Sequence, residues 1–139
     1  MKRHRFATFL LVVLAMAGGD LAFAGDKDPL FVSLTTDDAY RSVLAITFSK
    51  NMSDRGHPLT IVFNDRGILV TSKANAEKFK EQHAILAELA KAGATLIACS
   101  NCMKHYGIKE SDLLDGIKVG NPQMTGDALF RDNTKTLAW

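Results

Sequence analysis

Short runs of apolar and β-branched residues recur along the chain from residue 30 onward, and polar or turn-forming residues bound each run. Runs of this length and composition are typical of strands that are buried inside a protein. The pattern therefore predicts five strands, at residues 30–35, 59–63, 94–98, 117–119 and 134–139.

The longer segments between these runs carry their apolar residues at helical spacing. The clearest is 76–92, where Phe79, Leu86 and Leu89 share one face and the charged residues lie mostly elsewhere. Gly93 and Gly107 follow two of these segments, at positions where glycine favours a helix end. The spacing predicts helices at residues 39–52, 76–92, 101–106 and 122–131, with a helical turn at 111–114.

Strands that alternate with helices predict a single α/β domain of three layers, in which helices cover both faces of a parallel sheet. In open sheets of this kind, sites form in the crevice beyond the carboxyl ends of the strands. The segments at those ends are 35–38, 64–66, 99–102 and 120–121, and we expect 64–67 to be a loop.

The N-terminal 24 residues show the pattern of a secretory signal peptide. A basic start precedes an apolar run over residues 6–17, and the small residues Ala22 and Ala24 flank Phe23. The run is shorter than the roughly 20 residues that a membrane span requires. We expect cleavage after Ala24, a mature domain over residues 25–139, and a periplasmic or secreted location without a membrane anchor.

The charge of the mature domain gives no indication of an acidic partner. Removal of Lys2, Arg3, Arg5 and Asp20 with the signal peptide reduces 17 basic and 15 acidic residues to 14 of each. A balanced domain lacks the electrostatic signature of nucleic-acid binding, so we expect no nucleic acid among its partners.

The two cysteines of the chain, Cys99 and Cys102, lie where the strand at 94–98 leads into a helix. A thiol at the start of a helix meets unsatisfied N–H groups, which favour its reactive thiolate form. Lys104, His105 and Arg66 would add positive potential, and Asn101 would orient the turn or a ligand. A disulfide across so short a loop would add little stability, which favours a chemical role for the pair.

Other interpretations of the cysteine pair stay open at this point. C-x-x-C alone fits thioredoxin-like chemistry, but the motif here follows the third strand rather than an early one. A haem attachment would need histidine where Met103 stands. A metal module would use Cys99, Cys102 and His105, with His57 or His83 as a fourth ligand. The last interpretation is a pair of inert or disulfide-bonded cysteines without a chemical role.

The segment from Ala98 to Ile108, A-C-S-N-C-M-K-H-Y-G-I, resembles the DsrE/DsrF-like family. Val119-Gly-Asn-Pro122 and the terminal Leu137-Ala-Trp139 are similar to it as well, and the resemblance spans residues 29–139. It implies a mostly parallel five-stranded sheet and assembly into homo-oligomers, as trimers or hexamers. Two features depart from the family pattern, namely the second cysteine and the signal peptide.

The resemblance also implies that Cys99 carries sulfur as a persulfide, received from and passed to a partner protein or a small sulfur species. With Cys102 as a resolving thiol, the chain would be a sulfur carrier or sulfurtransferase that needs no cofactor or bound metal. The alternative from another class is a non-catalytic oligomeric subunit of a sulfur-oxidation or redox system, with a Cys99–Cys102 disulfide.

Overall fold

The strands of the domain form one all-parallel sheet in the order β4-β3-β2-β1-β5. The computed structural model describes residues 27–139. The strands are Leu30–Leu34 (β1), Leu59–Phe63 (β2), Thr95–Ala98 (β3), Ile117–Val119 (β4) and Lys135–Ala138 (β5). All five strands that the sequence predicts are confirmed, and the expectation of a mostly parallel sheet is met in full.

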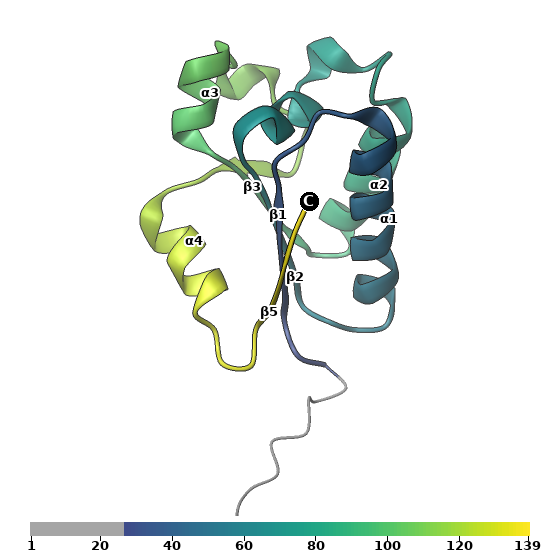
Figure 1. The fold of residues 1–139 in the computed structure, drawn as a ribbon, viewed down its shortest axis with the longest axis vertical. Coiled ribbons are helices and arrows are strands. Elements are labelled where there is room, and N and C mark those ends of the chain that lie inside the picture. Colours follow the sequence, from purple (N-terminus) through teal and green to yellow (C-terminus); the bar gives the residue numbers. More distant parts are fainter. Residues whose placement is uncertain (1–26) are drawn as a thin grey trace, which may run out of the picture.

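Helices cover both faces of this sheet, as the alternating pattern predicts. The α-helices are Ala39–Asp54 (α1), Lys80–Lys91 (α2), Ser100–Tyr106 (α3) and Pro122–Leu129 (α4), and short 3₁₀ helices are Asp65–Thr71 (η2), Lys73–Asn75 (η3) and Glu110–Asp112 (η4). In Figure 1, α1 and α2 lie on one side of the strands and α4 lies on the other. The three-layer arrangement is therefore confirmed.

The main core lies between the sheet and the helices α1 and α2. Alternate strand residues such as Val32 and Ile61 point to this side and pack with Ile46 of α1 and Leu86 of α2. The residues between them along the strands point to the opposite face, because side chains alternate along a strand. There a smaller cluster joins Phe31, Val62 and Ile97 to α4, through Met124, Ala128 and Leu129.

The prediction of a helix over 76–92 is wrong at its beginning, since α2 begins at Lys80. Residues 76–79 form a turn, and Phe79 has a non-helical backbone (φ −118°, ψ 31°). The Phe79 ring is completely buried. Burial of this large ring in the core outweighs the small intrinsic preference of the flanking residues for helix.

The prediction of a plain loop at 64–67 is also wrong, because a 3₁₀ helix (η2) begins at Asp65 and continues to Thr71. Ile68 and Val70 of this helix are completely buried in the main core. The remaining helix boundaries differ from the prediction by one or two residues, which is within the usual uncertainty of helix ends.

The predicted signal peptide lies outside the described residues, and so does its cleavage point. Across residues 27–139, no helix is long and apolar enough to cross a membrane.

Candidate functional site

The two cysteines lie at the junction of β3 and α3, at the carboxyl end of the sheet. Cys99 is the N-cap residue of α3, and it forms a disulfide with Cys102, with 5.2 Å between their Cα atoms. Backbone hydrogen bonds hold the junction to its neighbours: Cys99 N–H donates to Phe63 O (3.1 Å) and Gly120 N–H to Ala98 O (2.8 Å). The ends of β2, β3 and β4 therefore position this pair.

Each sulfur atom accepts a hydrogen bond from a backbone N–H group. Cys102 N–H donates to Sγ of Cys99 at 3.2 Å, and Asp65 N–H donates to Sγ of Cys102 at 3.2 Å. A hydrogen bond to the charged form of a group favours that form. Both donors are therefore in place to stabilise thiolates once the disulfide is reduced.

The donor to Cys102 is fixed by a second contact from α3. Asp65 has a positive φ of 44°, an uncommon conformation for a residue other than glycine. Tyr106 Oη donates a hydrogen bond of 2.7 Å to the Asp65 carboxylate, and this bond raises the pKa of Tyr106. Tyr106 thus ties the start of η2 to α3, on the side of the site where Cys102 lies.

A cavity of about 260 Å³ opens beside Cys99, at the carboxyl ends of β2, β3 and β4. It is lined by Val62, Asn64, Cys99, Ser100, Asn101, Gly120, Asn121, Pro122 and Thr125. Cys102 is not one of the lining residues, and it packs against the main core instead. The two cysteines therefore differ in environment, and Cys99 is the one that a small ligand in this cavity would meet.

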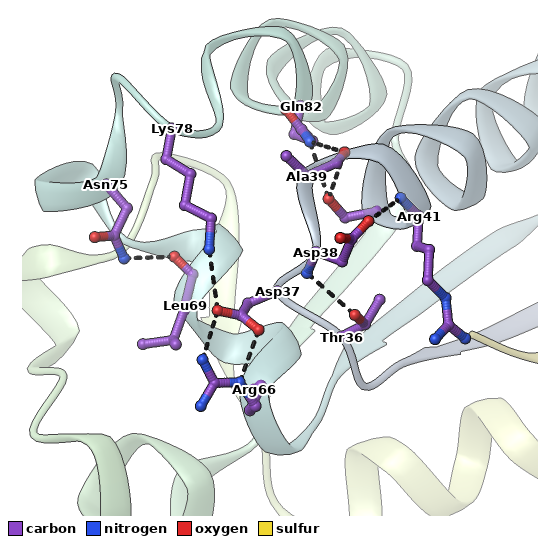
Figure 2. A network of polar contacts seen from close by, with 11 residues as sticks. Thr36, Asp37, Asp38, Ala39, Arg41, Arg66, Leu69, Asn75, Lys78 and Gln82 are labelled. Atoms are coloured by element: carbon purple, nitrogen blue, oxygen red, sulfur yellow. Dashed lines mark hydrogen bonds and ion pairs between the residues drawn. The ribbon is translucent and has the colours of Figure 1, made fainter.

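A cluster of charged side chains joins three segments at the same end of the sheet, namely the loop after β1, the 3₁₀ helix η2 and the turn before α2 (Figure 2). Asp37, which follows β1, accepts two hydrogen bonds from the Arg66 guanidinium (2.7 and 2.8 Å) and one from Lys78 Nζ (3.0 Å). These cations hold the pKa of the Asp37 carboxyl well below its usual range, with the Arg66 hydrogen bonds as the largest cause.

Replacement of Asp37 by asparagine is expected to destabilise the fold by about 1 kcal/mol at pH 7, a typical value for partly exposed pairs. The folded-state pKa of Asp37 is depressed, so its contribution is present above the unfolded value of about 4 and is lost as pH falls below it. Urea unfolding should show that the difference in free energy of unfolding between the wild type and the variant is smaller at pH 3 than at pH 7. Asp38→Asn is the matched control, since asparagine also caps α1. An advantage that is equal at both pH values would contradict this assignment.

The structure brings together only part of the set of residues that the sequence nominates around the cysteines. Asn101 lines the cavity beside Cys99. Arg66 is bound to Asp37 and is not a lining residue, while Lys104 and His105 are exposed in the last turn of α3. The His105 ring lies edge-to-face against Tyr106, with 4.7 Å between centroids.

The other two histidines among residues 27–139, His57 and His83, make packing and loop contacts. His83 is half-buried and its Nε2 lies 2.8 Å from Val70 O, and burial lowers its pKa. His57 contacts Asp28 O through Nδ1 at 2.8 Å. In the described part of the chain, no three His, Cys, Asp or Glu residues come together in a way that could hold a metal ion.

Some residues of the site were not nominated from the sequence. Asn64, Asn121 and Thr125 line the cavity, and Asp65 and Tyr106 support Cys102. Asn64 and Asn121 do lie at predicted carboxyl ends of strands, so the rule that sites form beyond these ends could have identified both. Thr125 and Tyr106 carry no such signal, because only the packing of α4 and α3 brings them to the site.

The fold and the site together define a small all-parallel α/β domain with a close cysteine pair after its third strand. The sequence model of the DsrE/DsrF-like family matches residues 30–130, and the chain belongs to this family, which is associated with sulfur relay. No curated protein matches the chain in sequence.

Solved structures show the same fold at low sequence identity. A protein of unknown function from Methanobacterium thermoautotrophicum, MTH1491, is 21% identical, with a TM-score of 0.67 over 81% of this chain and 100% of its own. The ychN protein from E. coli is 11% identical, with a TM-score of 0.67 over 81% of this chain and 99% of its own. At these identities the similarity supports the fold.

Proposed function

We propose that this protein carries sulfane sulfur as a persulfide on Cys99, with Cys102 as the resolving thiol. The observation that carries the proposal is the unequal placement of the two cysteines: Cys99 lines a cavity, whereas Cys102 does not line it and packs against the main core. The family's association with sulfur relay supports the same chemistry.

The reaction begins from the reduced pair. The Cys99 thiolate attacks the outer sulfur of a donor R–S–SH, the S–S bond of the donor breaks, and Cys99–S–SH forms as R–S⁻ leaves. An acceptor thiolate then attacks the outer sulfur, takes it as a new persulfide, and restores the Cys99 thiolate.

Cys102 provides a second exit from the loaded state. Its thiolate attacks the inner sulfur of Cys99–S–SH, HS⁻ leaves, and the Cys99–Cys102 disulfide remains. The sulfane sulfur is reduced to sulfide by the two electrons that the pair of thiols gives up. An external dithiol must then reduce the disulfide before the next cycle.

Intact-mass spectrometry of the reduced protein tests the proposal. After incubation with inorganic polysulfide, the protein is expected to gain one sulfur atom, and a reductant is expected to remove it. The sample before incubation is the control. A reduced protein that neither takes up sulfur from polysulfide nor releases sulfide would refute the proposed carriage.

The disulfide in the structure favours a second candidate function. In this candidate the cysteines stay paired and the domain is a non-catalytic subunit that binds a partner of a sulfur-oxidation or redox system. Titration of free thiols before and after treatment with a mild reductant separates the two candidates. A pair that stays oxidised after this treatment supports the second candidate.

The proposal includes export of the mature domain, supported by the basic, apolar and small-residue pattern of residues 1–24. The protein recovered from the periplasm or medium is expected to have the mass of a chain that begins at Gly25. A mass that retains residues 1–24 would contradict cleavage.

We also propose that the domain forms a homo-oligomer through an apolar stripe on α1 and β5. The stripe consists of Tyr40, Leu44, Phe48 and Leu137, which are 71%, 45%, 37% and 37% exposed. The three α1 residues are four apart and so share one face, and Phe48 and Leu137 line the same cavity of about 280 Å³. The resemblance to an oligomeric family supports a second copy of this chain as the occupant.

Leu44→Glu is expected to convert the oligomer to a monomer, because a charge buried in an apolar contact without a partner is strongly unfavourable. Light scattering after size-exclusion chromatography measures the change. Phe130→Glu is the control, since Phe130 is 83% exposed and lies outside the stripe. A monomeric wild type, or dissociation by Phe130→Glu alone, would contradict the proposed stripe.

A further inference from the structure

The cavity beside Cys99 has an uncharged polar lining. Within residues 27–139, the side chains that line it include three amides and two hydroxyl groups but no Lys, Arg, His, Asp or Glu. The amides come from three different elements: Asn64 follows β2, Asn101 lies in α3 and Asn121 caps α4. Such a lining provides hydrogen bonds to a ligand but no charged side chain that would neutralise a charge on the ligand.

Two of the cations at this end of the sheet are engaged elsewhere. Arg66 and Lys78 both bind the Asp37 carboxylate, and neither lines the cavity. Transfer of a charged group from water into a site without a counter-charge is costly, and the cost rises steeply with the charge. The lining therefore disfavours a dianion more strongly than a monoanion or a neutral ligand.

Two of the amides have one polar group already occupied. Asn121 Oδ1 accepts a hydrogen bond from Met124 N–H (2.8 Å), which leaves its NH₂ group as the donor for a ligand. Asn64 Nδ2 donates to Ser33 Oγ (3.0 Å), which leaves its carbonyl oxygen as an acceptor. The lining thus combines donors and acceptors, as suits a thiol or persulfide that carries a proton in one form and a single charge in the other.

The size of the cavity restricts the ligand further. Its volume of about 260 Å³ lies below the roughly 300–1,000 Å³ of pockets that enclose drug-sized ligands. Its wall at Gly120 is tight, because a Cβ atom there would lie 3.1 Å from Ala98 O and 2.5 Å from a methyl carbon of Ile97. A small molecule fits this space better than a nucleotide or another extended cofactor.

We infer that this cavity binds a small sulfane-sulfur donor of at most one negative charge, such as a hydropolysulfide or the persulfide of a small thiol, and disfavours thiosulfate. The inference rests on the proposed function of Cys99. When the donor is bound, the Cys99 thiolate attacks its outer sulfur, the donor S–S bond breaks, and the donor thiolate leaves with the electron pair of that bond.

The first test places a negative charge in the cavity without disturbing the helix cap. Asn121→Asp keeps an oxygen for Met124 N–H, so α4 remains capped. Loading of reduced protein by inorganic polysulfide is expected to slow about tenfold, since like charges a few ångströms apart repel strongly in a partly buried site. Asn133→Asp is the matched control: Asn133 is exposed, follows α4 and precedes β5, and does not line the cavity.

The second test adds the missing cation. Thr125→Lys is expected to raise the rate of sulfur uptake from thiosulfate about tenfold, because a charge at this position compensates part of the dianion's lost hydration. Uptake from polysulfide is expected to change much less. Gln123→Lys, in the same helix but outside the lining, is the control.

A third readout does not depend on sulfur transfer. Alkylation of the reduced Cys99 by neutral iodoacetamide and by anionic iodoacetate gives a rate ratio, which Asn121→Asp is expected to raise about tenfold. Measurement in a Cys102→Ser background restricts the reaction to Cys99. Unchanged ratios and unchanged loading in Asn121→Asp would overturn the cavity assignment. A Cys102→Ser protein that takes up no sulfur, with the ratio shifted as expected, would refute the proposed carriage and keep the cavity.

Discussion

Cys99→Ser is expected to abolish sulfur uptake completely, because a serine hydroxyl cannot form a persulfide with the donor. Cys102→Ser is the matched variant, since it removes the other sulfur of the same pair while Cys99 keeps its place on the cavity wall. It is expected to load sulfur as the wild type does, but to release no sulfide, because no thiol remains to attack the inner sulfur.

Intact mass and sulfide release, followed together, separate these roles. Loading that survives in Cys99→Ser and disappears in Cys102→Ser would reverse the assignment of the two thiols. Sulfide release that is unchanged in Cys102→Ser would contradict the resolving step, while carriage on Cys99 would stand. Unfolding curves of both variants, compared under reducing conditions, control for a loss of structure.

Gly67→Ala is expected to destabilise the fold by about 3 kcal/mol, the upper end of the usual cost of overpacking. A Cβ atom at Gly67 would overlap the Leu34 carbonyl oxygen and lie 2.7 Å from its carbon. That oxygen already accepts a hydrogen bond from Asn64 N–H (2.9 Å), so the backbone of β1 cannot move away without breaking it. Since η2 carries the Asp65 N–H group to Cys102, the substitution should disturb the site as well.

Thermal or urea unfolding measures this change in stability. Gly126→Ala is the matched control, because Gly126 lies in α4 and a Cβ atom there would meet nothing within 4 Å. It is expected to stabilise the fold by about 0.5–1 kcal/mol, the difference in helix propensity between the two residues. A Gly67→Ala variant as stable as the wild type would show that η2 does not approach β1 as closely as described.

The sequence predicted the secondary structure best where local pattern and burial agree. The strands 30–34 and 59–63 are short apolar runs, and each is buried in the sheet. The beginning of α2 and the 3₁₀ helix η2 were missed for a common reason. Phe79, Ile68 and Val70 are placed by contacts with the core, and those contacts come from residues distant in the chain.

The candidate site divides in the same way. The positions of Cys99 and Cys102 at the carboxyl end of the third strand follow from the sequence, since the strand and the glycine-terminated helix after it are both local signals. Arg66 shows the limit of such reasoning. It was expected to add positive potential at the cysteines, but the fold brings Asp37 from the loop after β1 to bind it.

The sequence by itself determined the α/β class, the strands and their order along the chain, and the close cysteine pair. Short apolar runs, helical periodicity and Gly107, which has a left-handed backbone at the end of α3, are signals that each lie within a few residues of the feature they predict. Only the tertiary structure decided that Cys99 faces a cavity while Cys102 faces the core. That difference depends on how residues from β2, α4 and the segment after β4 form a cavity beside Cys99, which no local pattern specifies.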